Sequence, residues 1–278
     1  MTSSSTKPFA VVTGASNGIG YALATQFAQH GFDLLVAAED AAIATAAHAF
    51  EGLGATVESL RVDLATYDGV EELYGKITAS GRPLNAIAIN AGVGVGGDFT
   101  RGTDLQAELK LIDLNVTSSV HLAKRVLPDM VGRGNGRVLF TSSIAATMPA
   151  PFEAVYGASK AFVLSFAEAL RNELKDTGVS VTALMPGPTD TNFFHRAGMD
   201  DTKAGAGQEG RPGRGGASGL RSADGGQGPR RCRFAQEQAV RRGQRSAARD
   251  RQGRGAPPPR RAGVGRQIAG RPQPDQGS

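Results

Sequence analysis

Short apolar runs alternate with segments of helical spacing along the first two hundred residues of the chain. The apolar runs predict buried strands at residues 9–13, 34–38, 59–62, 86–89, 138–141 and 179–185. The segments between them predict helices at residues 18–30, 41–53, 69–80, 104–127 and 154–175. Strands that are apolar on both faces and separated by helices form a parallel sheet that helices cover on both sides. The alternation therefore predicts a doubly wound α/β fold with at least six parallel strands.

The alternation stops near Lys203, where the composition changes. Residues 204–278 contain 17 Gly, 16 Arg and few aliphatic or aromatic residues, so they cannot bury enough apolar surface to offset about 1–2 kcal/mol of backbone entropy per residue. We expect a folded domain over residues 1–203 and a disordered Arg/Gly-rich tail over residues 204–278. The tail carries a net charge of about +11, against about −6 for the rest. The overall basicity is therefore weak support for a nucleic-acid partner.

The cysteine and histidine content predicts neither a disulfide nor a metal site. Cys232 is the single cysteine, and the four histidines are scattered without metal-ligand spacing. The first eight residues are too short and polar for a signal peptide, and no apolar run approaches the ~18 residues of a membrane span. We expect a cytoplasmic protein with no membrane partner.

A glycine-rich turn follows the first predicted strand and runs into the first predicted helix, with the sequence Thr13-Gly14-Ala15-Ser16-Asn17-Gly18-Ile19-Gly20. Glycines let the backbone turn tightly and approach a pyrophosphate, and the helix N-terminus offers unpaired N–H groups and positive potential. Such a turn can also be a plain tight connection, and its spacing differs from the common Gly-x-Gly-x-x-Gly pattern. We expect it to bind a dinucleotide through six residues: Gly14, Ser16, Asn17, Gly18, Ile19 and Gly20.

Two other strand ends are candidates for the adenosine half of that dinucleotide. Asn90-Ala91-Gly92 closes the fourth strand, where small residues would let the chain pass close to the cofactor. Asp63, followed by Leu64, closes the third strand and can accept a hydrogen bond from an adenine amino group. A lone Asp at this place is also typical of a turn or a helix cap.

The end of the second strand, about twenty residues beyond the glycines, should decide between NAD and NADP. The sequence there is Ala37-Ala38-Glu39-Asp40, with no Arg or Lys, and Asn17 before Gly18 is neutral. A 2′-phosphate would face carboxylates and no cation, whereas Glu39 could accept hydrogen bonds from free ribose hydroxyls. The sequence therefore favours NAD over NADP.

Tyr156 and Lys160 stand four residues apart at the start of the last predicted helix, so their side chains share one face. By itself such a pair is typical of a solvated helix edge. Ser142-Ser143 closes the fifth strand thirteen residues before the tyrosine, and Asn115 lies in the long predicted helix at 104–127. Together with the glycine turn, Asn90-Ala91-Gly92 and Pro186-Gly187, this series resembles the short-chain dehydrogenase/reductase family in order and spacing over residues 8–192.

The resemblance implies a Rossmann-like oxidoreductase that moves a hydride between nicotinamide and a carbonyl or secondary alcohol. It implies four catalytic residues, Asn115, Ser143, Tyr156 and Lys160, and a structural role for Ser142. Tyr156, Lys160, Pro186, Gly187 and Thr189 are further cofactor contacts that it implies. Family members that prefer NAD usually carry the acid at the place of Ala38, so Glu39 is displaced by one residue. Homodimers or homotetramers, and a small-molecule ketone or secondary alcohol as substrate, are also implied for an intact member.

The roles of the four residues follow from the reaction. Free tyrosine has a pKa near 10, too high for an efficient base at neutral pH. A cation ~4 Å away at an effective dielectric of ~20 favours phenolate by ~4 kcal/mol, so we expect Lys160 to bring the pKa of Tyr156 near 7. Ser143 would hydrogen-bond the substrate oxygen, and Asn115 would hold a water that relays protons to Lys160. A cofactor-binding protein without turnover stays as an alternative, although a pure binder has no need of all four.

Apolar residues flank the predicted site, at 148–152 and at Phe193-Phe194. They predict a substrate with a hydrophobic body, or they pack on the sheet as loop residues. The family continues beyond this point with a lid and a seventh strand, which residues 204–278 do not resemble. Arg codons that begin with CG and Gly codons that begin with GG become codons that begin with G when they are read one base later, and these encode Val, Ala, Asp, Glu or Gly. An Arg/Gly-rich segment can therefore be an ordinary sequence read in the wrong frame. We expect a frameshift near residues 204–211. An Arg/Gly-rich appendage that binds nucleic-acid phosphates is the alternative.

Overall fold

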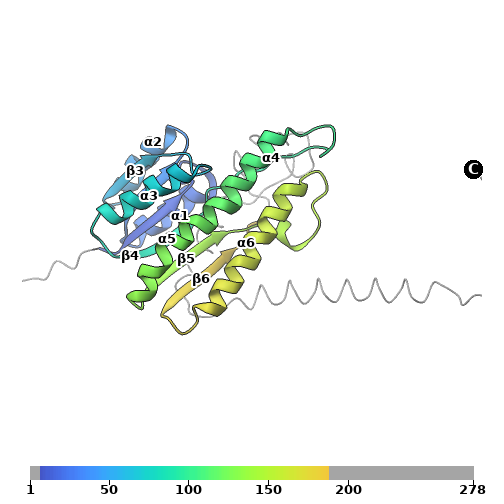
Figure 1. The fold of residues 1–278 in the computed structure, drawn as a ribbon. Helices are drawn as coiled ribbons and strands as arrows, with labels where there is room; N and C mark the ends of the chain where they lie inside the picture. The colour runs from blue at the N-terminus through green and yellow to red at the C-terminus, as the bar shows by residue number, and fades with distance from the viewer. Residues whose placement is uncertain (1–6, 188–278) are drawn as a thin grey trace, which may run out of the picture. The chain divides into compact units, whose positions relative to one another are not determined.

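A parallel six-stranded sheet forms the centre of the computed structural model, which describes residues 7–187 (Figure 1). The strand order is β3-β2-β1-β4-β5-β6, and every neighbouring pair is parallel. The strands are β1 (Phe9–Thr13), β2 (Asp33–Ala38), β3 (Val57–Arg61), β4 (Leu84–Ile89), β5 (Gly136–Thr141) and β6 (Val179–Leu184). The chain starts in the middle of the sheet, winds outward to β3 and then outward the other way to β6. The predicted doubly wound α/β fold is therefore confirmed.

Helices cover both faces of the sheet (Figure 1). They are α1 (Gly18–Gln29), α2 (Ala42–Glu51), α3 (Tyr67–Ala79), α4 (Leu105–Ile112), α5 (Ser118–Gly132) and α6 (Ala154–Glu173). Successive strand residues point to opposite faces, so Val11 packs with α3, α5 and α6, while Val12 packs with α1 and α2. All strands and all helices except the one at 104–127 lie within two residues of their predicted bounds.

The prediction of a buried third strand was wrong, because β3 is the edge of the sheet. Leu60 is its only buried residue, and Glu58, Ser59 and Arg61 are exposed. Strand β6, at the other edge, carries no charged residue and pairs only with β5 among the described residues. Charged side chains on an edge strand oppose pairing with another chain, and β3 has them whereas β6 does not.

The long helix predicted at 104–127 is two helices joined by the π-helical turn η1 (Asp113–Thr117). A π turn accommodates one residue more per turn than an α-helix and often lies at a functional site. The hydroxyls of Ser118 and Ser119 donate to the carbonyls of Leu114 and Asn115 inside this turn. Helix α5 also continues through Pro128 to Gly132 instead of ending at Leu127, since the fully buried Met130 packs in the core beyond the proline.

Parallel strands bring their carboxyl ends to one edge of the sheet, where ligands of such folds bind. Among the described residues, the ends of β1 to β6 carry the predicted site residues that do not lie on helices. Within residues 7–187 no helix is both long and apolar enough to cross a membrane. The predicted domain boundary at 203, the tail, Thr189 and Phe193-Phe194 lie outside the described residues.

Candidate active site

A cavity of about 570 Å³ opens at the carboxyl ends of the strands. Its wall contains every described residue that we predicted to contact a cofactor: Gly14, Ser16, Asn17, Gly18, Ile19, Gly20, Glu39, Asp63, Leu64, Asn90, Ala91, Gly92, Tyr156, Lys160, Pro186 and Gly187. Ser143 lines the same cavity, while Asn115 lies buried behind it. One cavity therefore unites the predicted cofactor residues with three of the four predicted catalytic residues.

The glycine turn is shaped by backbone positions that a side chain would disrupt. Gly14 and Gly18 have φ angles of +66° and +58°, in the left-handed region that favours glycine. A Cβ at Gly20 would lie 2.0 Å from the carbonyl oxygen of Gly14, so α1 can approach the turn only with glycine there. Helix α1 begins at Gly18 and directs its N-terminus at the cavity. This cradle fits an anionic dinucleotide, because the backbone can come close to a pyrophosphate.

Asn90 ties three strands together at the base of the cavity. Its Nδ2 donates to the carbonyl of Thr13 at 3.0 Å, and its Oδ1 accepts from the hydroxyl of Thr141 at 2.9 Å. The sequence analysis named Thr13 only as the start of the glycine-rich turn and missed Thr141, which carried no spacing signal. Gly92 was expected beside the adenosine half, but a Cβ there would lie 3.2 Å from Lys160 Nζ, so this glycine belongs to the catalytic end.

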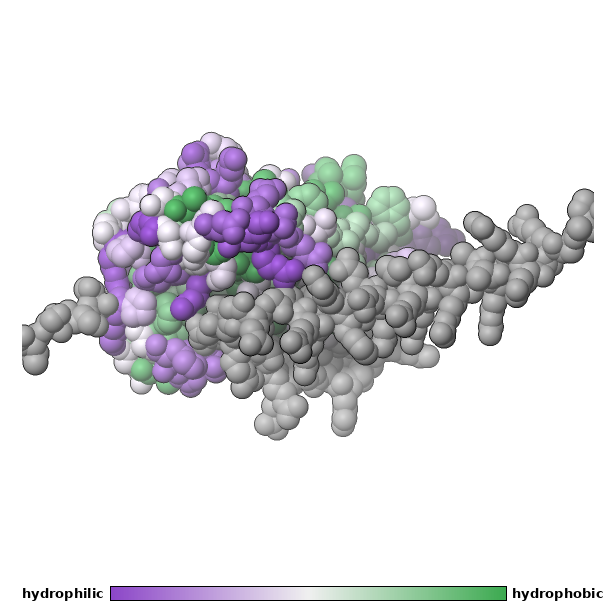
Figure 2. All heavy atoms as spheres, turned by 90° about the horizontal axis from the view of Figure 1, so that it is seen from below, coloured by the Kyte–Doolittle hydropathy of each residue, from purple (hydrophilic) through white to green (hydrophobic). Residues whose placement is uncertain are grey.

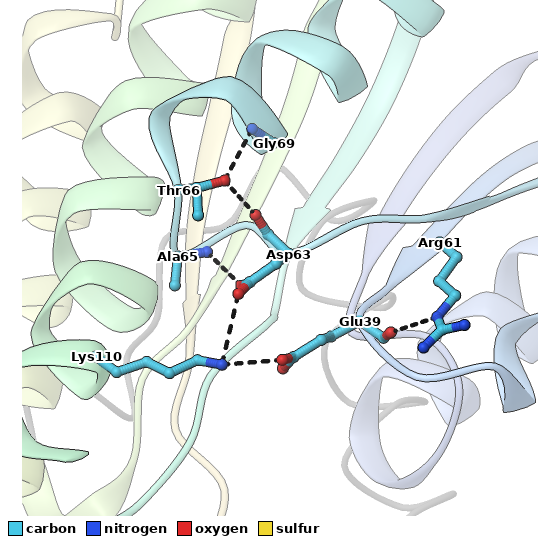
Figure 3. A network of polar contacts seen from close by, with 7 residues as sticks. All are labelled: Glu39, Arg61, Asp63, Ala65, Thr66, Gly69 and Lys110. Atoms are coloured by element: carbon cyan, nitrogen blue, oxygen red, sulfur yellow. Dashed lines mark hydrogen bonds and ion pairs between the residues drawn. The ribbon is translucent and has the colours of Figure 1, made fainter. Parts of the chain in front are cut away.

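Two cations that the sequence analysis missed lie beside Glu39 and Asp63, at the end of the cavity where we expect the adenosine half and which we call the adenosine end (Figure 3). Lys110 of α4 places its Nζ 2.9 Å from Glu39 Oε1 and 3.5 Å from Asp63 Oδ2. Arg61 Nε donates to the backbone carbonyl of Glu39 at 3.0 Å. The expectation that no cation lies near the end of β2 was therefore wrong. Lys110 is 71 positions away from Glu39 in the chain, and only the packing of α4 brings it there.

Asp63 has the turn-forming role that the sequence left open, and it lines the cavity as well. Its Oδ1 accepts from the backbone N–H of Ala65 at 2.9 Å, and its carbonyl accepts from the hydroxyl of Thr66 at 2.9 Å. Thr66 in turn caps α3 by accepting from the N–H of Gly69 at 3.0 Å. Asp63 is thus held by the start of α3, with Oδ2 on the side of Lys110.

Asn115 lies in the π turn with an exposed fraction of 1%. Its Nδ2 donates to the carbonyl of Val93 at 2.9 Å and to the hydroxyl of Ser159 at 3.0 Å, while its Oδ1 accepts from the N–H of Val93 at 2.9 Å. The side chain therefore joins the loop after β4 to α6. Its predicted part in a proton relay stays a prediction.

Tyr156 and Lys160 face the cavity from the first turns of α6, and both are buried. Lys160 Nζ lies 5.7 Å from the centroid of the Tyr156 ring and donates to the carbonyl of Thr141 at 3.0 Å. The hydroxyl of Ser142 donates to the backbone carbonyl of Lys160 at 2.8 Å, which is the structural role expected for it.

The prediction of a tyrosine pKa near 7 was wrong for the packing of the described residues. Burial raises the pKa of Tyr156 to about 12, against a lowering effect of its hydrogen bond with Ser143 and with a further raising effect of Glu153. Burial also lowers the pKa of Lys160 to about 8. The prediction considered the attraction between ammonium and phenolate but left out the cost of removing both charged forms from water.

The loop before α6 forms the remaining wall. Met148, Pro149 and Ala150 line the cavity, which is one of the two alternatives left open for this segment, and Glu153 lines it too. Burial raises the pKa of the Glu153 carboxyl. The sequence analysis missed this residue, although an acid three positions before the tyrosine could have been noticed. Phe152 is 68% exposed with a φ of +65°, and its carbonyl accepts from the N–H of Gly97 at 2.8 Å.

Known proteins resemble the chain over most of its length. The family described as short chain dehydrogenase matches residues 8–202. An uncharacterized short-chain type dehydrogenase/reductase of Sinorhizobium fredii is 35% identical over 192 residues, which is 68% of this chain and 72% of the other. An NADP-dependent 3-hydroxy acid dehydrogenase of Salmonella typhimurium is 30% identical, over 70% of this chain and 79% of the other. A solved short-chain dehydrogenase from Sphingobium yanoikuyae in complex with NADPH is 29% identical with a TM-score of 0.76, covering 86% of this chain and 95% of that one.

Proposed function

The chain belongs to the short-chain dehydrogenase family, and from this premise we propose that it transfers a hydride between a nicotinamide cofactor and a carbonyl or secondary alcohol. The observation that carries the proposal is that Ser143, Tyr156 and Lys160 line the same cavity as the glycine turn. When bound, the nicotinamide supplies the hydride chemistry, and the protein supplies placement and proton transfer.

We propose that Tyr156 is the general acid and base. In carbonyl reduction its hydroxyl gives a proton to the substrate oxygen, and in alcohol oxidation its phenolate takes that proton back. Ser143 hydrogen-bonds the same oxygen, since its hydroxyl already bonds to Tyr156. Lys160 stabilises the phenolate electrostatically whenever its amine is protonated. Asn115 fixes the loop after β4 against α6 and would hold the relay water.

A direct test uses a panel of ketones with NADH and NADPH, followed by loss of reduced-cofactor absorbance. Turnover of any ketone by the wild-type chain and its loss in Tyr156→Phe, with cofactor binding retained, supports the assignment. A chain that binds cofactor and turns over no carbonyl or alcohol in the panel would favour the alternative of a cofactor-binding protein without turnover.

Cofactor preference rests on the adenosine end. Glu39, Asp40 and Asp63 line the cavity there, whereas the described lining includes neither Lys110 nor Arg61. Ser16 donates to Asp40 Oδ2 at 2.7 Å, which fixes a further negative charge beside the glycine turn. We propose that NAD is preferred over NADP, although relatives with NADP in their names are similar to this chain. Fluorescence titration with NADH and NADPH tests this, and tighter NADPH binding would contradict it.

We propose a substrate with a hydrophobic body. Ile144, Met148 and Pro149 line the cavity, and Met148 and Phe152 are more than 60% exposed. On the face that Figure 2 shows, hydrophobic surface gathers at one side of the described part of the chain, with smaller hydrophobic spots among hydrophilic residues elsewhere. Increasing catalytic efficiency along a series of ketones with longer apolar groups would support the proposal, and a flat series would contradict it.

We also propose that an intact chain forms homodimers or homotetramers through its long helices. Leu105, Leu109 and Ile112 of α4 and Phe162 of α6 are large apolar side chains that are 37–65% exposed. Light scattering of the purified protein tests this assembly.

The frameshift hypothesis gains support from β6. Its outer edge carries no charge, unlike that of β3, so a further strand from an in-frame C-terminus would cover it. The nucleotide sequence discriminates at once: a family-like reading frame one base away after residue 204 supports the hypothesis. The nucleic-acid-binding appendage is supported instead if no such frame exists and the chain binds RNA in a salt-dependent way.

A further inference from the structure

The function proposed above gives no role to Lys110, the lysine on α4 (Figure 3). Its Nζ lies between two carboxylates, at 2.9 Å from Glu39 Oε1 and 3.5 Å from Asp63 Oδ2. Glu39 follows β2 and Asp63 follows β3, so one ammonium group connects the ends of two strands to α4. Both carboxylates line the cavity. Lys110 therefore places positive charge directly beside the acids that a 2′-phosphate would meet.

The main chain of both acids is fixed without the help of Lys110. Asp63 is held by Ala65 and Thr66, and a Cβ at Gly69 would lie 2.0 Å from its carbonyl oxygen, so α3 is packed directly against it. Glu39 has its carbonyl bonded to Arg61 Nε at 3.0 Å. Loss of the Lys110 ammonium should therefore change the charge at this end and leave the backbone in place.

The contact of Lys110 with Glu39 is solvated, since their side chains are 48% and 58% exposed. Exposed ion pairs of this kind are weak, because water already stabilises both charges. A phosphate group carries more negative charge than a carboxylate and forms stronger charge-assisted hydrogen bonds with an ammonium group. The long lysine side chain can therefore exchange its carboxylate partner for a phosphate at small cost.

We propose that Lys110 is a specificity-determining residue that limits the preference for NADH over NADPH; the inference rests on the proposed cofactor binding. With NADH, the ammonium stays on Glu39 and Asp63, and Glu39 accepts from the ribose hydroxyls. With NADPH, the ammonium turns to the 2′-phosphate and offsets its repulsion by the two carboxylates. The lysine thus admits a cofactor that the carboxylates alone would reject.

The principal test compares Lys110→Met with Lys76→Met in the full chain. Lys76 forms an equivalent pair with Glu58, at 2.8 Å and with side chains 46% and 53% exposed, and neither residue lines the cavity. Dissociation constants for NADH and NADPH are measured by fluorescence titration at low salt. We expect Lys110→Met to weaken NADPH binding about tenfold and NADH binding less than about threefold, because a charge-assisted contact is lost only with the phosphate. Lys76→Met should change neither.

A second pair of variants separates charge from positioning. Glu39→Gln should tighten NADPH binding, and the added Lys110→Met should remove that gain. A lysine that only positions the Glu39 carboxylate would lose all effect once Glu39 is Gln. Adenosine 2′,5′-bisphosphate and 5′-AMP, which lack the nicotinamide half, should show the same contrast between Lys110→Met and Lys76→Met. Lys110→Arg keeps the positive charge and should retain NADPH binding. This variant keeps the test decisive even if Lys110→Met does not fold.

Equal effects of Lys110→Met on both cofactors, or no effect on NADPH, would overturn the inference. A wild-type chain that binds neither cofactor would instead overturn the proposed function. The two failures are distinguishable because the first requires measurable binding in the wild type.

Discussion

The two ends of the cavity differ in how far their ionisable side chains are exposed to water. At the adenosine end, Glu39, Asp63 and Lys110 have side chains that are 58%, 36% and 48% exposed and lie close to opposite charges. At the catalytic end, Tyr156 and Lys160 are only 9% and 5% exposed. Burial there shifts both pKa values toward the neutral forms, to about 12 for the tyrosine and about 8 for the lysine.

This contrast separates recognition from chemistry. Solvated ion pairs are weak and can change partners, which suits a site that must tell one ribose from another. Desolvated groups respond strongly to any charge that arrives, because interactions are stronger in a low dielectric. With its pKa raised to about 12, Tyr156 keeps its proton at neutral pH and can act as a donor, and positive charge beside it favours the phenolate. Substitutions at the adenosine end should therefore change cofactor binding, and substitutions at the catalytic end should change turnover.

The largest expected effect is at the catalytic end. Tyr156→Phe removes the proton donor and should reduce the turnover of an active ketone by about 10²–10⁴-fold, the usual contribution of general acid–base catalysis. The dissociation constant for NADH should change little, because only the hydroxyl is lost and a phenyl ring of the same shape remains. Steady-state kinetics measures the turnover, and fluorescence titration measures the dissociation constant for NADH. Unchanged turnover would remove Tyr156 from the mechanism.

The next effect concerns stability and pH. The folded-state pKa of Lys160 is about 8, below its ordinary value of 10.5, so the unfolded chain binds more protons between these pH values. The free energy of unfolding should therefore rise from pH 8 to pH 10.5, by about 3 kcal/mol at ~1.4 kcal/mol per pKa unit. Urea unfolding at a series of pH values measures it, and Lys160→Met should flatten the rise.

Lys110 supplies the contrast at the other end. Its pKa is raised, chiefly by the hydrogen bond to Glu39, so its small contribution to the free energy of unfolding depends on pH in the opposite sense. This stabilisation is present below the ordinary lysine pKa and is lost as the pH rises through the folded-state pKa. A Lys110→Met chain should therefore keep the rise that Lys160 causes, and loss of the rise in this variant would count against the assignment.

Asn115→Ala should destabilise the chain by about 2 kcal/mol, because it removes the partner of the part-buried N–H and carbonyl of Val93 and the amide that donates to the buried Ser159 hydroxyl. Glu39→Gln should cost less than about 1 kcal/mol, since its pair with Lys110 is exposed. Chemical unfolding of the two variants side by side measures the difference. Equal costs would show that the contacts of Asn115 stabilise the chain no more than the exposed pair at the other end of the cavity does.

The smallest expected effect is on the pH profile of alcohol oxidation. Glu153 raises the pKa of Tyr156, so Glu153→Gln should move the rising limb of this profile to lower pH, by less than about one unit. The measurement is catalytic efficiency against pH for both chains. A shift to higher pH would show that the Glu153 carboxylate stabilises the phenolate instead.

The sequence predicted the fold because its signals are local. The glycine turn, the apolar strands and the spacing of Tyr156 from Lys160 each lie within a few residues, and the structure unites them because parallel strands share a carboxyl edge. The burial of β3 was predicted wrongly because an apolar residue such as Leu60 does not say whether its strand has one neighbour or two.

The adenosine end was the least predictable part of the site. Lys110 reaches Glu39 only because the fold brings its side chain from α4 to the residue that follows β2, and no local pattern reports such a contact. The catalytic pKa values were missed for a related reason, since desolvation depends on every residue packed around Tyr156 and Lys160. The spacing of residues in a sequence identifies the charged partners of a group but not how far the group is removed from water.

The π turn at Asp113–Thr117 fits one residue more into a turn than an α-helix does, so it absorbs that residue without rotating α5 relative to α4. Leu122, Val126 and Met130 therefore keep the inner stripe of α5 against the sheet. A one-residue deletion between 113 and 117 can close to an ordinary α turn and keep this stripe. A one-residue deletion at the start of α5 would instead rotate the residues beyond it by ~100°, away from the core. The extra residue thus changes how Asn115 is presented and leaves the register of the core helix intact.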